Sequence, residues 1–257
     1  MIEATQETIC SVVPRCELGG IDRQQMFNLL ARHFDGVTPE QFARDLGEKN
    51  WVLLLSRADG RLVGFSTILA YETSFGGKPL SVIYSGDTIV APEGWGSSAL
   101  ARGWISCVRE LRETYPRGPY FWLLLTSGFR TYRFLPVFWR EFHPRFDSVM
   151  PHVRRELRDH LALERFGRAY DSARGIVRFA HPQKLRGELK AIPQGRAQDP
   201  HVAFFLSQNP GHEEGDELVC LTELSDENLT RAGRRMIMPM DERLHRREAV
   251  GAPVATQ

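Results

Sequence analysis

Long hydrophobic runs are scarce in this 257-residue sequence. The longest, residues 51–55 and 120–125, fall far short of the roughly 18 to 20 apolar residues that a membrane-spanning helix needs. We therefore expect no membrane span. The first residues include Glu3 and Glu7, and no basic segment precedes an apolar one, so we expect no secretion signal either.

Cysteine is also scarce, and its four copies are scattered. They stand at Cys10, Cys16, Cys107 and Cys220, too far apart for a disulfide framework and without the Cys-x-x-Cys pairs typical of zinc sites. A reducing, cytoplasmic location is the expectation that fits them.

An excess of charge of one sign is missing as well. The 33 basic side chains nearly balance the 32 acidic ones, which removes the electrostatic argument for a general nucleic-acid binder. Lysine is rare, since 29 of the basic residues are Arg and only 4 are Lys. Arg suits phosphate and carboxylate recognition, but a base-composition bias explains the skew better because the arginines are spread over the whole chain.

Metal-ligand side chains come close together in the sequence only in the segment 212–217. It contains His212, Glu213, Glu214, Asp216 and Glu217 in a glycine-bounded loop. Their spacing matches no established ligand pattern, and a solvated acidic loop is the interpretation that we favour. No metal is expected.

Hydrophobic periodicity and turn signals predict an alternation of helices and strands. We expect helices over 21–36 and 39–47, a hairpin over 51–56 and 62–71, a strand over 80–90, a helix from about 100 to 111, a strand over 120–126 and a helical segment over 129–142. Residues 1–20 show no clear periodicity and predict an irregular lead-in. The pattern indicates an α/β fold with a mixed, mainly antiparallel sheet.

The last third is less regular. A helix over 153–166 and short strands over 175–179, 202–206 and 217–224 are expected between many prolines and glycines. Too few apolar residues lie there for an independent core. We expect two parts, a first domain over 1–145 and an irregular α+β extension over 146–257 packed on it.

The turn after the strand 80–90 carries the chemistry. Gly94, Trp95, Gly96, Ser97 and Ser98 lead directly into the next helix. A strand that ends in a Gly/Ser turn at a helix start presents free backbone N–H groups at the positive end of the helix dipole, which suits a phosphate. A plain turn with serine caps is the alternative.

This arrangement resembles the GNAT superfamily of acyl-CoA N-acyltransferases over roughly residues 21–145. In that family a turn of the form Arg/Gln-x-x-Gly-x-Gly/Ala cradles the coenzyme A pyrophosphate, but Ala91 stands here where the Arg or Gln falls. The resemblance implies that backbone N–H groups of the turn, Ser97, Ser98 and Arg102 hold the pyrophosphate. It also implies that the backbone near Ile89 and Val90 pairs with the pantetheine arm, in a splay beside the strand 120–126.

Acyl transfer to an amine needs a group that accepts the amine proton. Asp87 is the candidate, because a carboxylate in an apolar strand is costly unless it is used or paired; a turn cap or an ion pair with Arg is the alternative. Tyr84 lies on the other face of that strand and is a weaker candidate. The resemblance implies that Tyr132 protonates the leaving thiolate, with Ser127 where the family has Asn, although core packing of Tyr132 is the alternative.

The function expected from these features is transfer of an acetyl or longer acyl group to an amine of a small molecule. The donor is acetyl-CoA, another acyl-CoA or an acylated acyl carrier protein. A non-catalytic acyl-CoA-binding scaffold with the same fold is the rival, favoured by Ala91 and Ser127. The extension would close over the acceptor, line a pocket for an acyl chain longer than acetyl, form a homodimer surface or merely cover the sheet.

Overall fold

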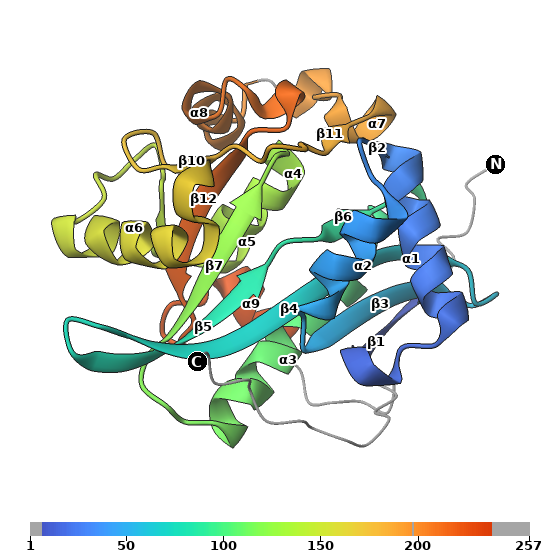
Figure 1. Cartoon of the computed structure of the whole chain (residues 1–257), viewed down its shortest axis with the longest axis horizontal. Coiled ribbons are helices and arrows are strands. Elements are labelled where there is room, and N and C mark those ends of the chain that lie inside the picture. The colour runs from blue at the N-terminus through green and yellow to red at the C-terminus, as the bar shows by residue number, and fades with distance from the viewer. Residues whose placement is uncertain (1–6, 197, 238–257) are drawn as a thin grey trace.

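A computed structural model describes residues 7–196 and 198–237 (Figure 1). Its framework is a ten-stranded sheet. The main path runs β1 (Thr8–Pro14), β3 (Trp51–Arg57), β4 (Leu62–Phe75), β5 (Lys78–Ser85), β7 (Tyr120–Thr126), β12 (Glu217–Glu223), β10 (Ile176–Val177) and β9 (Tyr170–Asp171). Two short strands lie off this path, β6 (Thr88–Val90) beside β4 and β8 (Phe142–His143) beside β12. All these pairs are antiparallel except β5 with β7, which confirms the mixed, mainly antiparallel fold.

Helices cover both faces of the sheet. They are α1 (Gly20–His33), α2 (Pro39–Gly47), α3 (Ala99–Thr114), α4 (Phe129–Tyr132), α5 (Phe134–Phe138), α6 (His152–Phe166), α7 (Gly187–Lys190), α8 (Pro200–Gln208) and α9 (Arg231–Met236). Figure 1 shows α1, α2 and α6 on the near face and α3 on the far one. The buried clusters agree, because α1 and α2 cover one half of the near face and α6 covers the other half.

The far face has the most aromatic core. Trp104 of α3 stacks on Trp122 of β7 with ring centroids 4.1 Å apart, and Trp139 meets Trp122 at 5.0 Å. Such contacts between large rings add to the area that they bury. They fix α3, and with it the turn that opens α3, against the strand β7.

Residues 8–14 and 202–206 adopt a different secondary structure from the one expected. Residues 8–14 form the edge strand β1, paired with β3 from Thr8–Arg57 to Pro14–Trp51, where an irregular lead-in was predicted. Residues 202–206 belong to the helix α8, not to a strand. Asp199 caps this helix by accepting a hydrogen bond from the His201 N–H at 3.0 Å, and Pro200 begins it.

The strand expected over 80–90 is interrupted. Between the pairs Leu69–Tyr84 and Ser66–Thr88, β4 contributes two residues and the opposite strand contributes three. One extra residue in one strand is a β-bulge, which bends the strand and redirects side chains. The bulge contains Gly86, where a Cβ would lie 2.6 Å from the Tyr84 hydroxyl.

The C-terminal third shares the sheet of the first part. β12 pairs with β7 from Leu218–Thr126 to Glu223–Phe121, and α8 adds the fully buried Phe205 to the core under α3. In the part of the chain that the structure describes, no helix has the length and apolar character needed to cross a bilayer.

Replacing Phe205 by Ala tests whether the C-terminal third stabilises the common core. We expect the free energy of unfolding to fall by about 3–5 kcal/mol, because a large buried ring leaves a cavity. Urea unfolding followed by tryptophan fluorescence and by circular dichroism measures this. Phe204→Ala, on the half-buried side of the same helix, is the control and should cost clearly less. Two separate transitions in the wild type, or a loss below about 1 kcal/mol in the Phe205 variant, would contradict the shared core.

Candidate functional site

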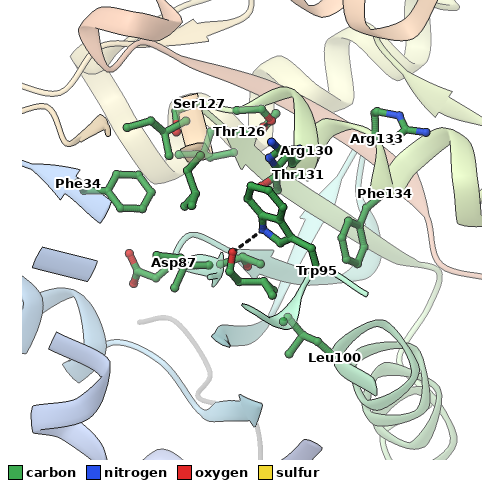
Figure 2. A pocket seen from close by; sticks show the side chains of 18 of the residues that line it. Phe34, Asp87, Trp95, Leu100, Thr126, Ser127, Arg130, Thr131, Arg133 and Phe134 are labelled. Atoms are coloured by element: carbon green, nitrogen blue, oxygen red, sulfur yellow. Dashed lines mark hydrogen bonds between the residues drawn. The ribbon is translucent and has the colours of Figure 1, made fainter. Parts of the chain in front are cut away.

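The site lies where two neighbouring strands part. β5 pairs with β7 as far as Ser85–Leu124. Beyond this pair the chain continues as β6 and stays with β4, whereas Leu125 and Thr126 of β7 pair only with β12. A cavity of about 560 Å³ occupies this parting, and Figure 2 shows Asp87 on one side of it and Thr126 and Ser127 on the other.

Within the part of the chain that the structure describes, the parting leaves one edge of β6 without a strand partner. The Thr67 N–H donates to the Asp87 carbonyl at 2.9 Å, and the Ala91 N–H donates to the Val63 carbonyl at 2.8 Å. Because strand residues alternate, Thr88 and Val90 direct their backbone groups away from β4, toward the parting. The Val90 carbonyl accepts a hydrogen bond from the Trp95 indole N–H at 2.8 Å.

The two residues expected to pair with a pantetheine arm therefore differ. Val90 lies at the open edge, whereas Ile89 pairs with Phe65 of β4, and its side chain is buried under α1. Both line the cavity. Of the described residues of β6, Thr88 and Val90 have backbone groups that point to the open edge.

The Gly/Ser turn contributes some of its residues. Gly94, Trp95 and Ser97 line the cavity, and a Cβ on Gly94 would lie 2.8 Å from a methyl carbon of Val90. Ser97 accepts hydrogen bonds from the Thr8 hydroxyl at 2.5 Å and the Ala99 N–H at 3.0 Å. Close packing of the turn on β6 thus explains the glycine at 94.

The other expected turn residues lie outside the cavity. Gly96 and Ser98 are exposed, Arg102 is half-buried, and none of the three is among the cavity-lining residues. Arg102 therefore does not reach this cavity directly.

Two carboxyl groups face the cavity, Asp87 after the bulge and Glu217 at the start of β12. Neither side chain has a hydrogen bond or ion pair with any residue from 7–196 or 198–237. The burial of the Glu217 carboxyl, together with the negative charges of Asp87 and Asp45, raises its pKa to about 8. Glu217 is therefore protonated at neutral pH, and Asp87 lies close enough to act on it.

The bulge also changes the expected position of Tyr84. Tyr84 is buried beneath α6, and burial followed by the charges of Glu217 and Asp87 raises its pKa well above the usual value. Tyr84 and Asp87 therefore belong to one electrostatic group, and the expectation that they lie on opposite faces is corrected. The extra residue in the bulge is the physical reason.

Tyr132 is not brought to the cavity. Its side chain is fully buried, and its hydroxyl donates a hydrogen bond to the Pro144 carbonyl at 2.9 Å. Its ring packs near Phe205 at a centroid distance of 5.6 Å. This corrects the expectation of a proton donor at Tyr132, whereas Ser127 does line the cavity at the end of β7.

Part of the cavity wall comes from a segment that the sequence did not indicate. Residues 183–196 contribute Gln183, Leu185, Leu189, Pro193, Gly195 and Arg196. The short strand β11 (Lys184–Leu185) ties this segment to β2 (Phe34–Asp35), and Arg186 forms an ion pair with Asp35. The C-terminal part thus closes one side of the cavity. Figure 1 shows its elements β11 and α7 near β2, above α1 in this view.

In the sequence, Glu217 stands out only as one member of the acidic segment 212–217. The other carboxyl groups of that segment are paired, Glu213 with Lys190, Glu214 with Lys184 and Asp216 with Arg178. Within the described residues no cluster of three or more His, Cys, Asp or Glu side chains is arranged to hold a metal ion. The available signal for Glu217 is its position, a carboxyl group immediately before an apolar strand.

Glu217→Gln tests whether the carboxyl group of Glu217 has a raised pKa in the folded protein. The unfolded chain releases this proton near pH 4.5 and the folded chain near pH 8, so between these values the unfolded state binds fewer protons. Stability of the wild type should therefore fall as the pH rises through this window, by an amount on the order of a few kcal/mol. The Gln variant should lack this contribution, as chemical denaturation at a series of pH values would show.

Glu223→Gln serves as the matched control, because Glu223 ends the same strand and is ion-paired with Arg154 at 2.6 Å. It should keep the wild-type pH slope. An identical slope in wild type and Glu217→Gln would contradict the burial of a protonated carboxyl group.

Comparison with known proteins yields similar solved structures. No family model matches the chain, and no curated protein matches it. A GNAT-family N-acetyltransferase of Escherichia coli, solved in complex with CoA, has 18% identity and a TM-score of 0.37 over 52% of this chain and 71% of that one. A probable N-acyltransferase of Enterococcus faecalis has 13% identity and a TM-score of 0.41 over 84% of this chain and 65% of that one. A GCN5-related N-acetyltransferase of Kribbella flavida has 19% identity and a TM-score of 0.37 over 51% of this chain, which spans only 32% of its length.

Proposed function

We propose that the chain transfers an acyl group from a phosphopantetheine thioester to an amine of a small molecule. The observation that carries the proposal is the cavity at the parting of β6 and β7, with an open strand edge along one wall and the carboxyl groups of Asp87 and Glu217 lining it. An extended amide-containing arm can pair with such an edge as an added strand does. Acyl-CoA and an acylated carrier protein both present this arm.

The reaction needs a proton acceptor and a proton donor. As the amine attacks the thioester carbonyl, the C–N bond forms, the C–S bond breaks, and the amine gives up one proton. We assign the acceptor role to Asp87. Glu217, protonated at neutral pH by its burial and its charged neighbours, is placed to return a proton to the departing thiolate.

The Asp87 carboxylate also favours an acceptor with a positive charge. A protonated amine is attracted toward it, loses one proton to solvent, and then attacks as the neutral amine that gives its second proton to Asp87. Phe34, Leu30 and Leu189 line the cavity and add an apolar wall for the rest of the acceptor. A small amine with an apolar body fits these features.

A non-catalytic acyl-thioester binder is the second candidate, favoured by the burial of Tyr132 away from the cavity. The two functions separate when the protein is mixed with acetyl-CoA and longer acyl-CoAs and a panel of amines, and free thiol is followed over time. Amine-dependent thiol release supports the transferase. Binding of CoA by calorimetry without release by any amine supports the binder, and no binding of CoA or of a carrier protein contradicts both.

Asp87→Asn tests the proton acceptor. Loss of a positioned base should slow transfer by about two orders of magnitude or more, while the affinity for the donor stays within about twofold. The measurements are the rate of thiol release at saturating donor and the dissociation constant from calorimetry. Asp59→Asn is the control, since this exposed carboxyl group in the turn between β3 and β4 does not line the cavity. Full activity of the Asp87 variant would remove Asp87 from the mechanism.

A further inference from the structure

Arginines gather at one end of the cavity. Arg130 on α4, Arg133 between α4 and α5, and Arg196 on the C-terminal segment all line it. Figure 2 shows Arg130 close to Trp95, and it shows Arg133 on the side of the view opposite Asp87 and Phe34. The cavity thus has carboxyl groups toward one end and guanidinium groups toward the other.

Arg130 is held in a fixed position. Its guanidinium group stacks on the Trp95 ring, 3.8 Å from the ring centroid. One of its terminal nitrogens donates to the carbonyls of Glu188 and Ala191 at 3.2 and 3.3 Å. Its Nε is buried without a hydrogen-bond partner among the residues described.

The positive charge at this end is poorly compensated. Arg133 pairs with Asp199 at 3.2 Å. Arg130 and Arg196 have no ion pair with any carboxylate of residues 7–196 and 198–237, although the charge of Glu188 acts on Arg130 from a greater distance. Burial and the charges of Arg133 and Arg196 lower the pKa of Arg130, as expected for neighbouring cations without enough counter-charge.

A second cavity provides a contrast. It has a volume of about 330 Å³ near the C-terminal end of α3 and also contains two arginines. There Arg112 pairs with Asp226 at 2.9 Å, and Arg109 pairs with Glu113 at 3.2 Å. These arginines have counter-charges within the protein, whereas Arg130 and Arg196 form no ion pair with the residues that the structure describes.

We infer that Arg130 and Arg196 bind a phosphate group of the ligand in the large cavity. The inference rests on the proposed function, in which that phosphate belongs to the phosphopantetheine of the donor. Guanidinium groups suit phosphate because their donors form a planar fork that matches its oxygens. The carboxylate of Asp87 repels an anion from the other end, so the charge distribution also sets the direction in which the donor lies.

This arrangement gives the C-terminal segment a role in donor binding. Arg196 lies on it, and its backbone carbonyls at 188 and 191 hold Arg130. Ion pairs of Lys184 with Glu214 and Lys190 with Glu213 attach the segment to the loop before β12. The segment thereby positions one phosphate-binding arginine and supplies the other.

Calorimetry with ligands that differ only in phosphate tests the inference. The probes are CoA, 4′-phosphopantetheine and pantetheine, measured with wild type, Arg130→Gln, Arg196→Gln and the double variant. We expect each single change to weaken binding of the phosphorylated probes about tenfold, the double change to weaken it further, and pantetheine binding to stay within twofold. Arg102→Gln is the control, because Arg102 lies on α3 near the turn but does not line the cavity.

The outcomes separate the inference from the proposed function. Equal losses for CoA and phosphopantetheine support the inference. A loss for CoA alone places the arginines at a phosphate of the nucleotide and overturns the assignment to the phosphopantetheine phosphate. Tight binding of CoA that neither variant changes would overturn the inference and leave the transferase proposal standing. No binding of any probe by the wild type would overturn both. Arg196 is exposed, so its variant keeps the test valid even if Arg130→Gln disturbs the fold.

Discussion

The β-bulge between β5 and β6 is the constraint on which the site depends. One extra residue bends the chain after Ser85, so that it continues beside β4 while β7 remains paired with β12. Without this bend the two strands would continue as a closed ladder, and no cavity could form between them. The same residue changes the alternation of side chains and brings Asp87 into one electrostatic group with Tyr84 and Glu217.

The C-terminal third completes the site. β12 fills the sheet position next to β7, which holds the far wall of the cavity in place and delivers Glu217 to its inner end. The segment 183–196 closes the cavity and contributes to the cluster of positive charge. An extension that merely covered the first part would leave the cavity with one carboxyl group and an open side.

Local signals in the sequence predicted most of the elements. Thr38 and Pro39 predicted the start of α2, and the Thr38 hydroxyl does accept a hydrogen bond from the Gln41 N–H at 3.2 Å. The rest depends on contacts between distant residues. A bulge has no strong local signature when Gly86 is its only glycine, and nothing near Glu217 indicates that its strand lies beside β7. Residues 202–206 are apolar enough for a strand, but the Asp199 cap and the core contact of Phe205 favour a helix.

The central claim is that the parting of β6 and β7 is the binding site for a phosphopantetheine thioester. A crystal structure of the protein with CoA tests it most directly. The account predicts the pantetheine arm along Thr88 and Val90, its sulfur toward Asp87 and Glu217, and a phosphate at Arg130 and Arg196. CoA bound at the second cavity, beside Arg109 and Arg112, or a parting closed by direct pairing of β6 with β7, would contradict it.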